Sequence, residues 1–235
     1  MSSAPALDLL PVLQRRTLGG TAYEHLAELL ASGRLAPGDR LSLRDVAAAL
    51  GVSVMPVREA VSRLVADRAL EVAPNRAVRV PVMTVSGFRA LAETRMAVEG
   101  LAAARAALNR TEAQLATIRA AEAAFRSLAR QQDPDRGHAA RLNRDLHFAI
   151  YEAAGLAPLQ EIIVGLWLKA GPVLNLDLRG HPERLRHGSA VLRHAEALGA
   201  IEAGDPAAAG AAVAADIGDA ADFIIGRGVL PVGDA

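Results

Sequence analysis

Hydrophobic residues near the start of the chain recur at helical spacing in three short segments. The first follows a capping-box pattern at Thr21–Glu24 and ends at Gly33, with apolar positions at Tyr23, Leu26, Leu29 and Leu30. The second begins at Ser42 and ends at Gly51. The third begins at Ser53, and its apolar face is Val57, Ala60, Val61, Leu64 and Val65. Two short helices joined through residues 50–52 are typical of a helix-turn-helix.

Short extended pieces accompany these helices. Arg40-Leu41 precedes the second helix, whereas Leu70–Val72 and Val78–Val80 follow the third and flank a turn at Pro74-Asn75. We expect Asn75 to take the left-handed conformation that a tight turn needs. Three helices and a hairpin within this length predict a winged helix-turn-helix over residues 17–82, after a flexible tail at 1–16.

The rest of the chain shows no alternating strand pattern from Thr84 onward. Its periodicity predicts about six helices in an antiparallel bundle over residues 84–228, so the fold class is mainly α. A loop is expected at Asp133–Gly137. The expected helices begin or end near Asn109, Thr111, Leu142, Gly155, Pro158, Leu168, Glu183, Ala203 and Pro206.

Charge and composition limit the classes of function that the chain can have. The formal net charge is zero, with 26 basic and 26 acidic residues, which argues against a wholly basic nucleic-acid coat. Residues 33–79 nevertheless carry eight arginines and five acids. The chain has no cysteine, and we find neither a signal-peptide pattern nor an apolar run long enough to span a bilayer. These features predict a cytoplasmic protein without a membrane partner.

Double-stranded DNA is the partner that this first domain predicts. In a helix-turn-helix the N-terminal end of the second helix of the motif lies against base edges in the major groove. Arg58 can read guanine or hold a phosphate, and the apolar tip can contact thymine methyl groups. The alternatives are solvated arginines and, for Val54 and Met55, core packing. The candidate DNA-binding residues are Arg44, Ser53, Val54, Met55, Pro56, Arg58, Asn75 and Arg76.

The segment from Gly33 to Val80 strongly resembles the GntR family of bacterial transcription regulators. The resemblance is carried by PGDRLS, by the GVS-x-x-PVREA core and by the RL that follows. It implies that Arg44, Arg58 and residues 53–56 contact DNA. Many members have Arg-Thr where this chain has Val54-Met55, and often Gly where it has Asn75, so the operator sequence does not carry over.

Polar residues interrupt the apolar faces of the second domain. Asn143 lies one helical turn before His147, and His194 and Asp216 lie on two later helices. Two imidazoles, a carboxylate and an amide that converge inside a bundle could ligate zinc, nickel, iron or manganese. The alternative is that each is a hydrogen-bonded core residue.

The order of helices over residues 85–226 resembles the FCD effector domain. That family's ligands are one Asp and three His. Here Asn143 replaces the Asp and Asp216 replaces the last His, whereas His147 and His194 match. The resemblance implies a possible divalent metal (Zn, Ni or Mn), although some members hold none, and the amide would weaken binding or change the metal.

Two further residues are candidates for effector binding. Arg95 matches the Arg of the family's R-x-x-x-E segment and could hold a carboxylate of an effector. The alternative is a surface ion pair with Glu99. His187, seven residues before His194, could line the same cavity or be a solvated residue.

Two functions are compatible with these features. The first is a homodimeric, ligand-responsive DNA-binding regulator that represses a catabolic or transport operon until a small organic acid binds the helical domain. The second is a metalloenzyme with a centre of two histidines and one carboxylate. The winged-helix segment favours the regulator, and no catalytic residue is expected.

Overall fold

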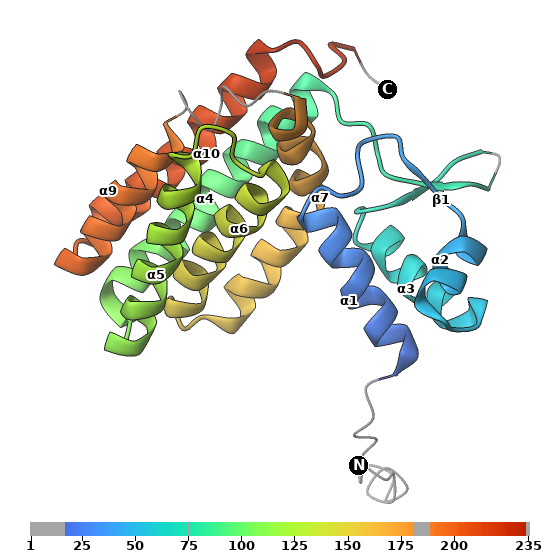
Figure 1. The fold of residues 1–235 in the computed structure, drawn as a ribbon, viewed down its shortest axis with the longest axis horizontal. Coiled ribbons are helices and arrows are strands. Elements are labelled where there is room, and N and C mark those ends of the chain that lie inside the picture. Colours follow the sequence, from blue (N-terminus) through green and yellow to red (C-terminus); the bar gives the residue numbers. More distant parts are fainter. Residues whose placement is uncertain (1–16, 75, 181–188, 234–235) are drawn as a thin grey trace, which may run out of the picture.

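The winged-helix segment forms the predicted helices in the computed structural model, which describes residues 17–74, 76–180 and 189–233 (Figure 1). Helices α1 (Leu18–Ala31), α2 (Leu43–Leu50) and α3 (Val54–Ala66) enclose a small aliphatic core. Leu26, Leu30, Val57 and Leu64 are almost fully buried there. The predicted tail at 1–16 lies outside the described residues.

Three short strands form the wing. Strand β3 (Val78–Arg79) lies between β1 (Arg40–Leu41) and β2 (Glu71–Val72), and both pairings are antiparallel. The Arg79 Nε donates to Glu71 Oε1 at 2.5 Å across the hairpin. The predicted hairpin is therefore confirmed, and Arg40-Leu41 adds a third strand to it.

The caps show why these helices start and end where they do. The Ser42 hydroxyl accepts from the Asp45 backbone N–H, and Gly51 ends α2 with a φ of 65°. The predicted N-terminus of α1 was wrong, although the helix itself is present. Its N-cap is Thr17, whose hydroxyl accepts from the Gly20 N–H, so Thr21 lies inside the helix rather than before it.

The C-terminal part of the chain is a helical bundle. It contains α4 (Val85–Asn109), α5 (Glu112–Ala129), α6 (Arg136–Ala153), α7 (Ala157–Gly180), α9 (Ala190–Ala203) and α10 (Pro206–Gly226). In the described residues this agrees with the six helices predicted. Its core is rich in alanine, which lets the helices approach closely. None of the described helices combines the length and apolarity needed to cross a bilayer.

Some helix boundaries differ from the prediction. Helix α6 begins at Arg136, capped by Asp135, so the expected loop is shorter. Helix α7 continues well past Leu168 and through Pro172. The predicted start of α9 at Glu183 lies outside the described residues. Leu192 in the first turn of α9 is exposed.

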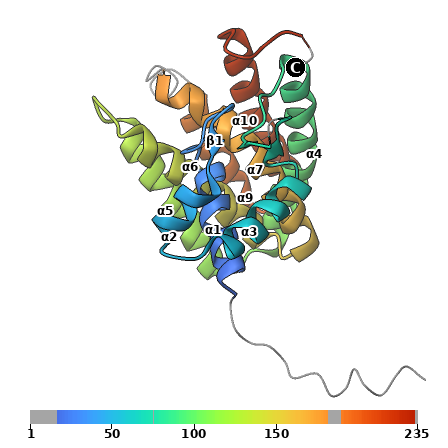
Figure 2. The same cartoon turned by 90° about the vertical axis from the view of Figure 1, so that its right-hand side faces the viewer.

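Helix α1 joins the two parts of the molecule. It lies between α3 and the bundle, and it packs against α7 (Figures 1 and 2). Leu168 of α7 belongs to the apolar cluster of the winged-helix domain. The winged-helix domain is therefore in direct contact with a helix of the bundle.

Candidate functional site

The N-terminal turn of α3 presents a mixed apolar and cationic surface. Ser53, Met55 and Arg58 are exposed, and 69% of Met55 is accessible. Val54 and Pro56 are half-buried, and Val54 packs against the domain core, as the alternative for that residue held. The buried face of α3 is the predicted stripe at Val57, Ala60, Val61 and Leu64.

An open cavity of about 600 Å³ lies beside this turn. Its lining combines the apolar Leu18 and Met55 with the guanidinium-bearing Arg58. A large apolar side chain that is exposed next to an unburied arginine suits contact with a base pair, which offers a methyl group and acceptor atoms at one edge.

The other two arginines predicted to contact DNA are also exposed. Arg44 lies in the first turn of α2, and Arg76 lies at the tip of the wing. Arg76 has a φ of 62° and therefore takes a left-handed conformation at this turn. Asn75, which was expected to take that conformation, lies outside the described residues.

Three of the predicted metal ligands meet inside the bundle. His147 comes from α6, His194 from α9 and Asp216 from α10, and one ligand atom of each lies within 4.8 Å of the other two. The His147 Nε2 lies 3.2 Å from Asp216 Oδ2, and the His194 Nε2 lies 3.7 Å from Asp216 Oδ1. All three are buried. Asn143 is half-buried one turn before His147, and its role as a fourth ligand stays a prediction.

His194 shows that this group suits a metal ion. Both of its ring nitrogens are buried and have no hydrogen-bond partner among the described residues. An unsatisfied buried polar atom costs about 1–3 kcal/mol, so a ligand at this position would relieve a cost already present in the fold. Phe125 packs edge-on against the imidazole at 4.7 Å between ring centroids and holds its plane.

The protonation state of Asp216 also suits a cation. Burial alone would raise the pKa of Asp216, but electrostatic attraction to the adjacent His194 and His147 imidazoles holds this pKa well below its usual range. Asp216 is therefore a carboxylate, which is the form that ligates metals.

Tyr151 orients the His147 ring. The Tyr151 hydroxyl donates to the Glu99 carboxylate, which can only accept, and it lies 2.8 Å from His147 Nδ1. The hydroxyl therefore accepts from His147 Nδ1–H, and Nε2 points toward Asp216. This relay resembles the support that metal-ligating histidines receive from neighbouring acceptors.

Arg95 forms the predicted pair with Glu99, but inside the protein. The Arg95 Nε and Nη2 donate to the two Glu99 oxygens at 2.6 and 3.2 Å, and both residues are buried. Burial lowers the pKa of Arg95, but the Glu99 carboxylate outweighs this and raises the pKa overall. The expectation of a surface ion pair is therefore wrong. The pair does not use Nη1, and an effector contact by Arg95 stays a prediction.

Sequence reasoning missed Tyr151 and Trp167, which support the site through Glu99. Glu99 accepts from Tyr151 and from Trp167 Nε1, the latter at 3.1 Å, in addition to Arg95. The four-residue spacing of His147 and Tyr151 could have indicated their contact. Nothing in the spacing of α4 and α7 could have indicated that Trp167 reaches Glu99. His187 lies outside the described residues.

Comparison with protein families matches nearly the whole chain. Residues 18–80 match bacterial regulatory proteins of the gntR family, and residues 90–219 match the FCD domain. The first range runs from α1 to β3, and the second begins within α4 and ends within α10. The metalloenzyme hypothesis receives no support from either match.

Named relatives and solved structures agree with these matches. The HTH-type transcriptional regulator McbR of Escherichia coli is 35% identical over 150 residues, 64% of this chain and 67% of McbR. A probable D-xylose utilization operon transcriptional repressor of Paenarthrobacter nicotinovorans is 28% identical over 83% of each chain. The solved structure of E. coli McbR/YncC has a TM-score of 0.82 at 28% identity and covers 91% of this chain and 99% of its own. The chain therefore belongs to the GntR family of bacterial transcription regulators and carries an FCD domain.

Proposed function

We propose that the protein is a cytoplasmic repressor whose DNA binding is controlled by a small organic acid bound in the FCD domain. The observation that carries this proposal is the combination in one chain of an exposed Arg58–Met55 surface on α3 and a buried His147–His194–Asp216 group in the bundle. A relative named as a repressor of a D-xylose utilization operon supports repression of a catabolic or transport operon.

The buried group would hold a divalent metal. His147 Nε2, a ring nitrogen of His194 and an Asp216 oxygen are the first ligands, with Asn143 as a weak fourth. Zinc, nickel and manganese all accept nitrogen and oxygen ligands of this kind. When bound, the metal would act as a Lewis acid toward a carboxylate of the effector. Arg95 and His187 are the residues we expect to contact the remaining polar groups of the acid.

A DNA-binding measurement tests the first part of the proposal. Duplex fragments that the purified protein retains from chromosomal DNA supply the operator, and fluorescence anisotropy then gives its Kd. We expect Arg58→Ala to weaken binding by about 1–3 kcal/mol, or roughly 5- to 150-fold. Arg130→Ala removes the same charge from an exposed position at the end of α5 and should leave Kd nearly unchanged. Equal Kd values for Arg58→Ala and the wild type would contradict this surface.

Elemental analysis tests the second part. Protein purified without a chelator or a His-tag is expected to contain nearly one zinc, nickel or manganese per chain. His194→Ala should lose it, whereas His25→Ala, which changes an exposed histidine on α1, should retain it. A wild-type protein that binds none of the three metals when they are added would refute the metal and leave DNA binding untouched.

We also propose that the protein acts as a homodimer. Leu101 and Leu108 are seven residues apart on α4, so they share one helix face, and 48% and 55% of them are exposed. Exposed leucines on one stripe favour a second copy of the chain as the partner. Light scattering should give twice 24.5 kDa for the wild type and a lower mass for Leu101→Glu. A monomeric wild type at working concentration would contradict the dimer.

A further inference from the structure

Helix α7 contacts both functional parts of the protein through consecutive residues. Trp167 donates its indole N–H to Glu99, and its ring centroid lies 5.5 Å from that of His147. Leu168, the next residue, is buried in the apolar cluster of the winged-helix domain. A displacement of Trp167 along or around the helix therefore displaces a core residue of the DNA-binding domain.

Gly171 shows how closely α7 approaches α1. A Cβ at this position would lie 2.8 Å from both the Cα and the carbonyl oxygen of Ala31, and closer still to the Leu30 carbonyl oxygen. These are backbone atoms, so they cannot rotate away as a side chain would. The contact exists only because residue 171 is glycine.

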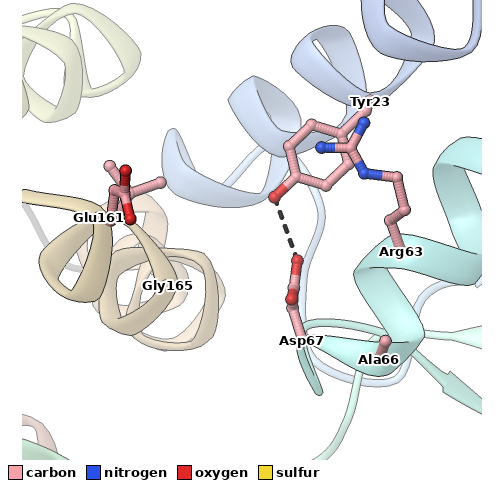
Figure 3. Close-up of a pocket in the computed structure, with 7 residues that line it drawn as sticks. Tyr23, Arg63, Ala66, Asp67, Glu161 and Gly165 are labelled. Atoms are coloured by element: carbon pink, nitrogen blue, oxygen red, sulfur yellow. Dashed lines mark hydrogen bonds between the residues drawn. The ribbon is translucent and has the colours of Figure 1, made fainter. Parts of the chain in front are cut away.

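The contact between α7 and the winged-helix domain is close at Gly171 and open near Gly165. Near Gly165, α7 and the winged-helix domain leave a cavity of about 450 Å³, lined also by Tyr23, Arg63, Asp67 and Glu161. Figure 3 shows the Tyr23 hydroxyl directed at Asp67 and the Arg63 guanidinium over the Tyr23 ring, with Glu161 and Gly165 on the opposite side. A Cβ at Gly165 would meet nothing within 4 Å.

Helix α6 makes a second contact with α1. Arg144 Nη1 lies 2.5 Å from Glu28 Oε2 on α1, and its guanidinium lies over the Phe148 ring at 5.2 Å. Phe148 in turn packs edge-on against Trp167 at 5.4 Å. The contact of α6 with α1 is thus connected to Trp167 of α7 through Arg144 and Phe148.

We infer that α7 is the mechanical connection between the FCD site and the DNA-binding domain, and that Gly171 is the positioning residue on which this connection depends. A change in packing around Glu99 and Trp167 reaches α1 through Leu168 and the backbone contact at Gly171. The inference deepens the proposed function and rests on it, because it assigns the route by which an occupied site would change the winged helix.

Hydrogen exchange in full-length protein tests the route without DNA, metal or effector. Glu99→Gln perturbs the site, and the amides of residues 26–31 in α1 report on the docking. We expect Glu99→Gln to change their exchange at least about fivefold in the wild-type background and in the Gly165→Ala background. In the Gly171→Ala background we expect the same substitution to change it less than about twofold, since α1 is already undocked.

Two results of this exchange experiment would contradict the connection through α7. An equal effect of Glu99→Gln in the Gly171→Ala and Gly165→Ala backgrounds would overturn it, as would the absence of any effect in the wild type. If Glu99→Gln does not fold, Trp167→Phe replaces it, because this change removes the indole N–H donor to Glu99 while it keeps an aromatic ring at this position. DNA binding and metal content are measured separately, so the proposed function can fail while the route holds, and the reverse.

Discussion

Glu99 is fully buried and serves donors from three helices. Arg95 on its own helix, Tyr151 on α6 and Trp167 on α7 all donate to its two oxygens. The spacing of Arg95 and Glu99 predicts their pairing, but periodicity on one helix cannot show what a neighbouring helix places opposite. The sequence identified His147, His194 and Asp216 as candidates because they interrupt apolar helix faces. The contacts of Tyr151 and Trp167 with Glu99 became visible only in the fold.

Removing the charge of Glu99 should be costly. Glu99→Gln leaves the Arg95 guanidinium buried without its counter-ion, and breaking such a pair costs about 3–5 kcal/mol of unfolding free energy. Urea denaturation measures it. Glu202→Gln, which breaks the exposed pair with Arg119, is the matched control and should cost at most about 1 kcal/mol. Similar losses for the two variants would contradict a buried network.

Tyr151 should make the folded protein lose stability at alkaline pH. Burial raises the pKa of its hydroxyl well above 10, and the nearby Glu99 carboxylate adds to the shift. Above pH 10 the unfolded tyrosine ionises while the folded one keeps its proton, so this contribution is complete below pH 10 and is lost as pH rises. Between pH 9 and pH 11 the wild type should lose about 1 kcal/mol more than Tyr151→Phe in urea unfolding. Parallel losses would show that Tyr151 ionises normally in the folded protein.

At the scale of elements, local signals predicted several helix ends and missed others, among them the starts of α1 and α6 and the end of α7. Gly51, Thr111 and Asp205 act as the caps that their patterns indicate, because a cap depends on residues within one turn. Thr17 and Thr21 both precede plausible helix starts, and only packing chooses between them. Helix α7 was expected to end near Leu168, but tertiary contacts carry it through Pro172, a residue that cannot donate to the Leu168 carbonyl.

The crossing of α4 and α10 depends on two facing glycines. A Cβ at Gly100 would lie 3.1 Å from the Gly210 carbonyl oxygen, and the reverse distance is 3.0 Å. We expect Gly100→Ala to lower the melting temperature, since the helices must separate and the lost packing exceeds the helix propensity gained, about 1 kcal/mol. Gly199→Ala on α9 meets nothing within 4 Å and should raise the melting temperature. An increase in both variants would mean that the crossing has room.

At the scale of the whole molecule, the two domains were predictable separately but their docking was not. The winged helix follows from three amphipathic segments and a hairpin, and the bundle follows from helical periodicity after Thr84. Leu168 and Gly171 carry no local sign that they face another domain, because an apolar residue or a small residue in a helix is equally suited to the bundle core. The relation between site and DNA-binding surface therefore comes from the three-dimensional arrangement.

The affinity for operator DNA with the FCD site loaded with metal and empty tests the control of DNA binding by this site most directly. Fluorescence anisotropy on a retained duplex gives Kd with zinc added and with zinc removed by a chelator, at one fixed salt concentration. We predict that Kd for the wild type differs at least about fivefold between the two conditions, and that Kd for His194→Ala is the same in both. The same Kd for the wild type with and without zinc would contradict control of DNA binding by an occupied metal site.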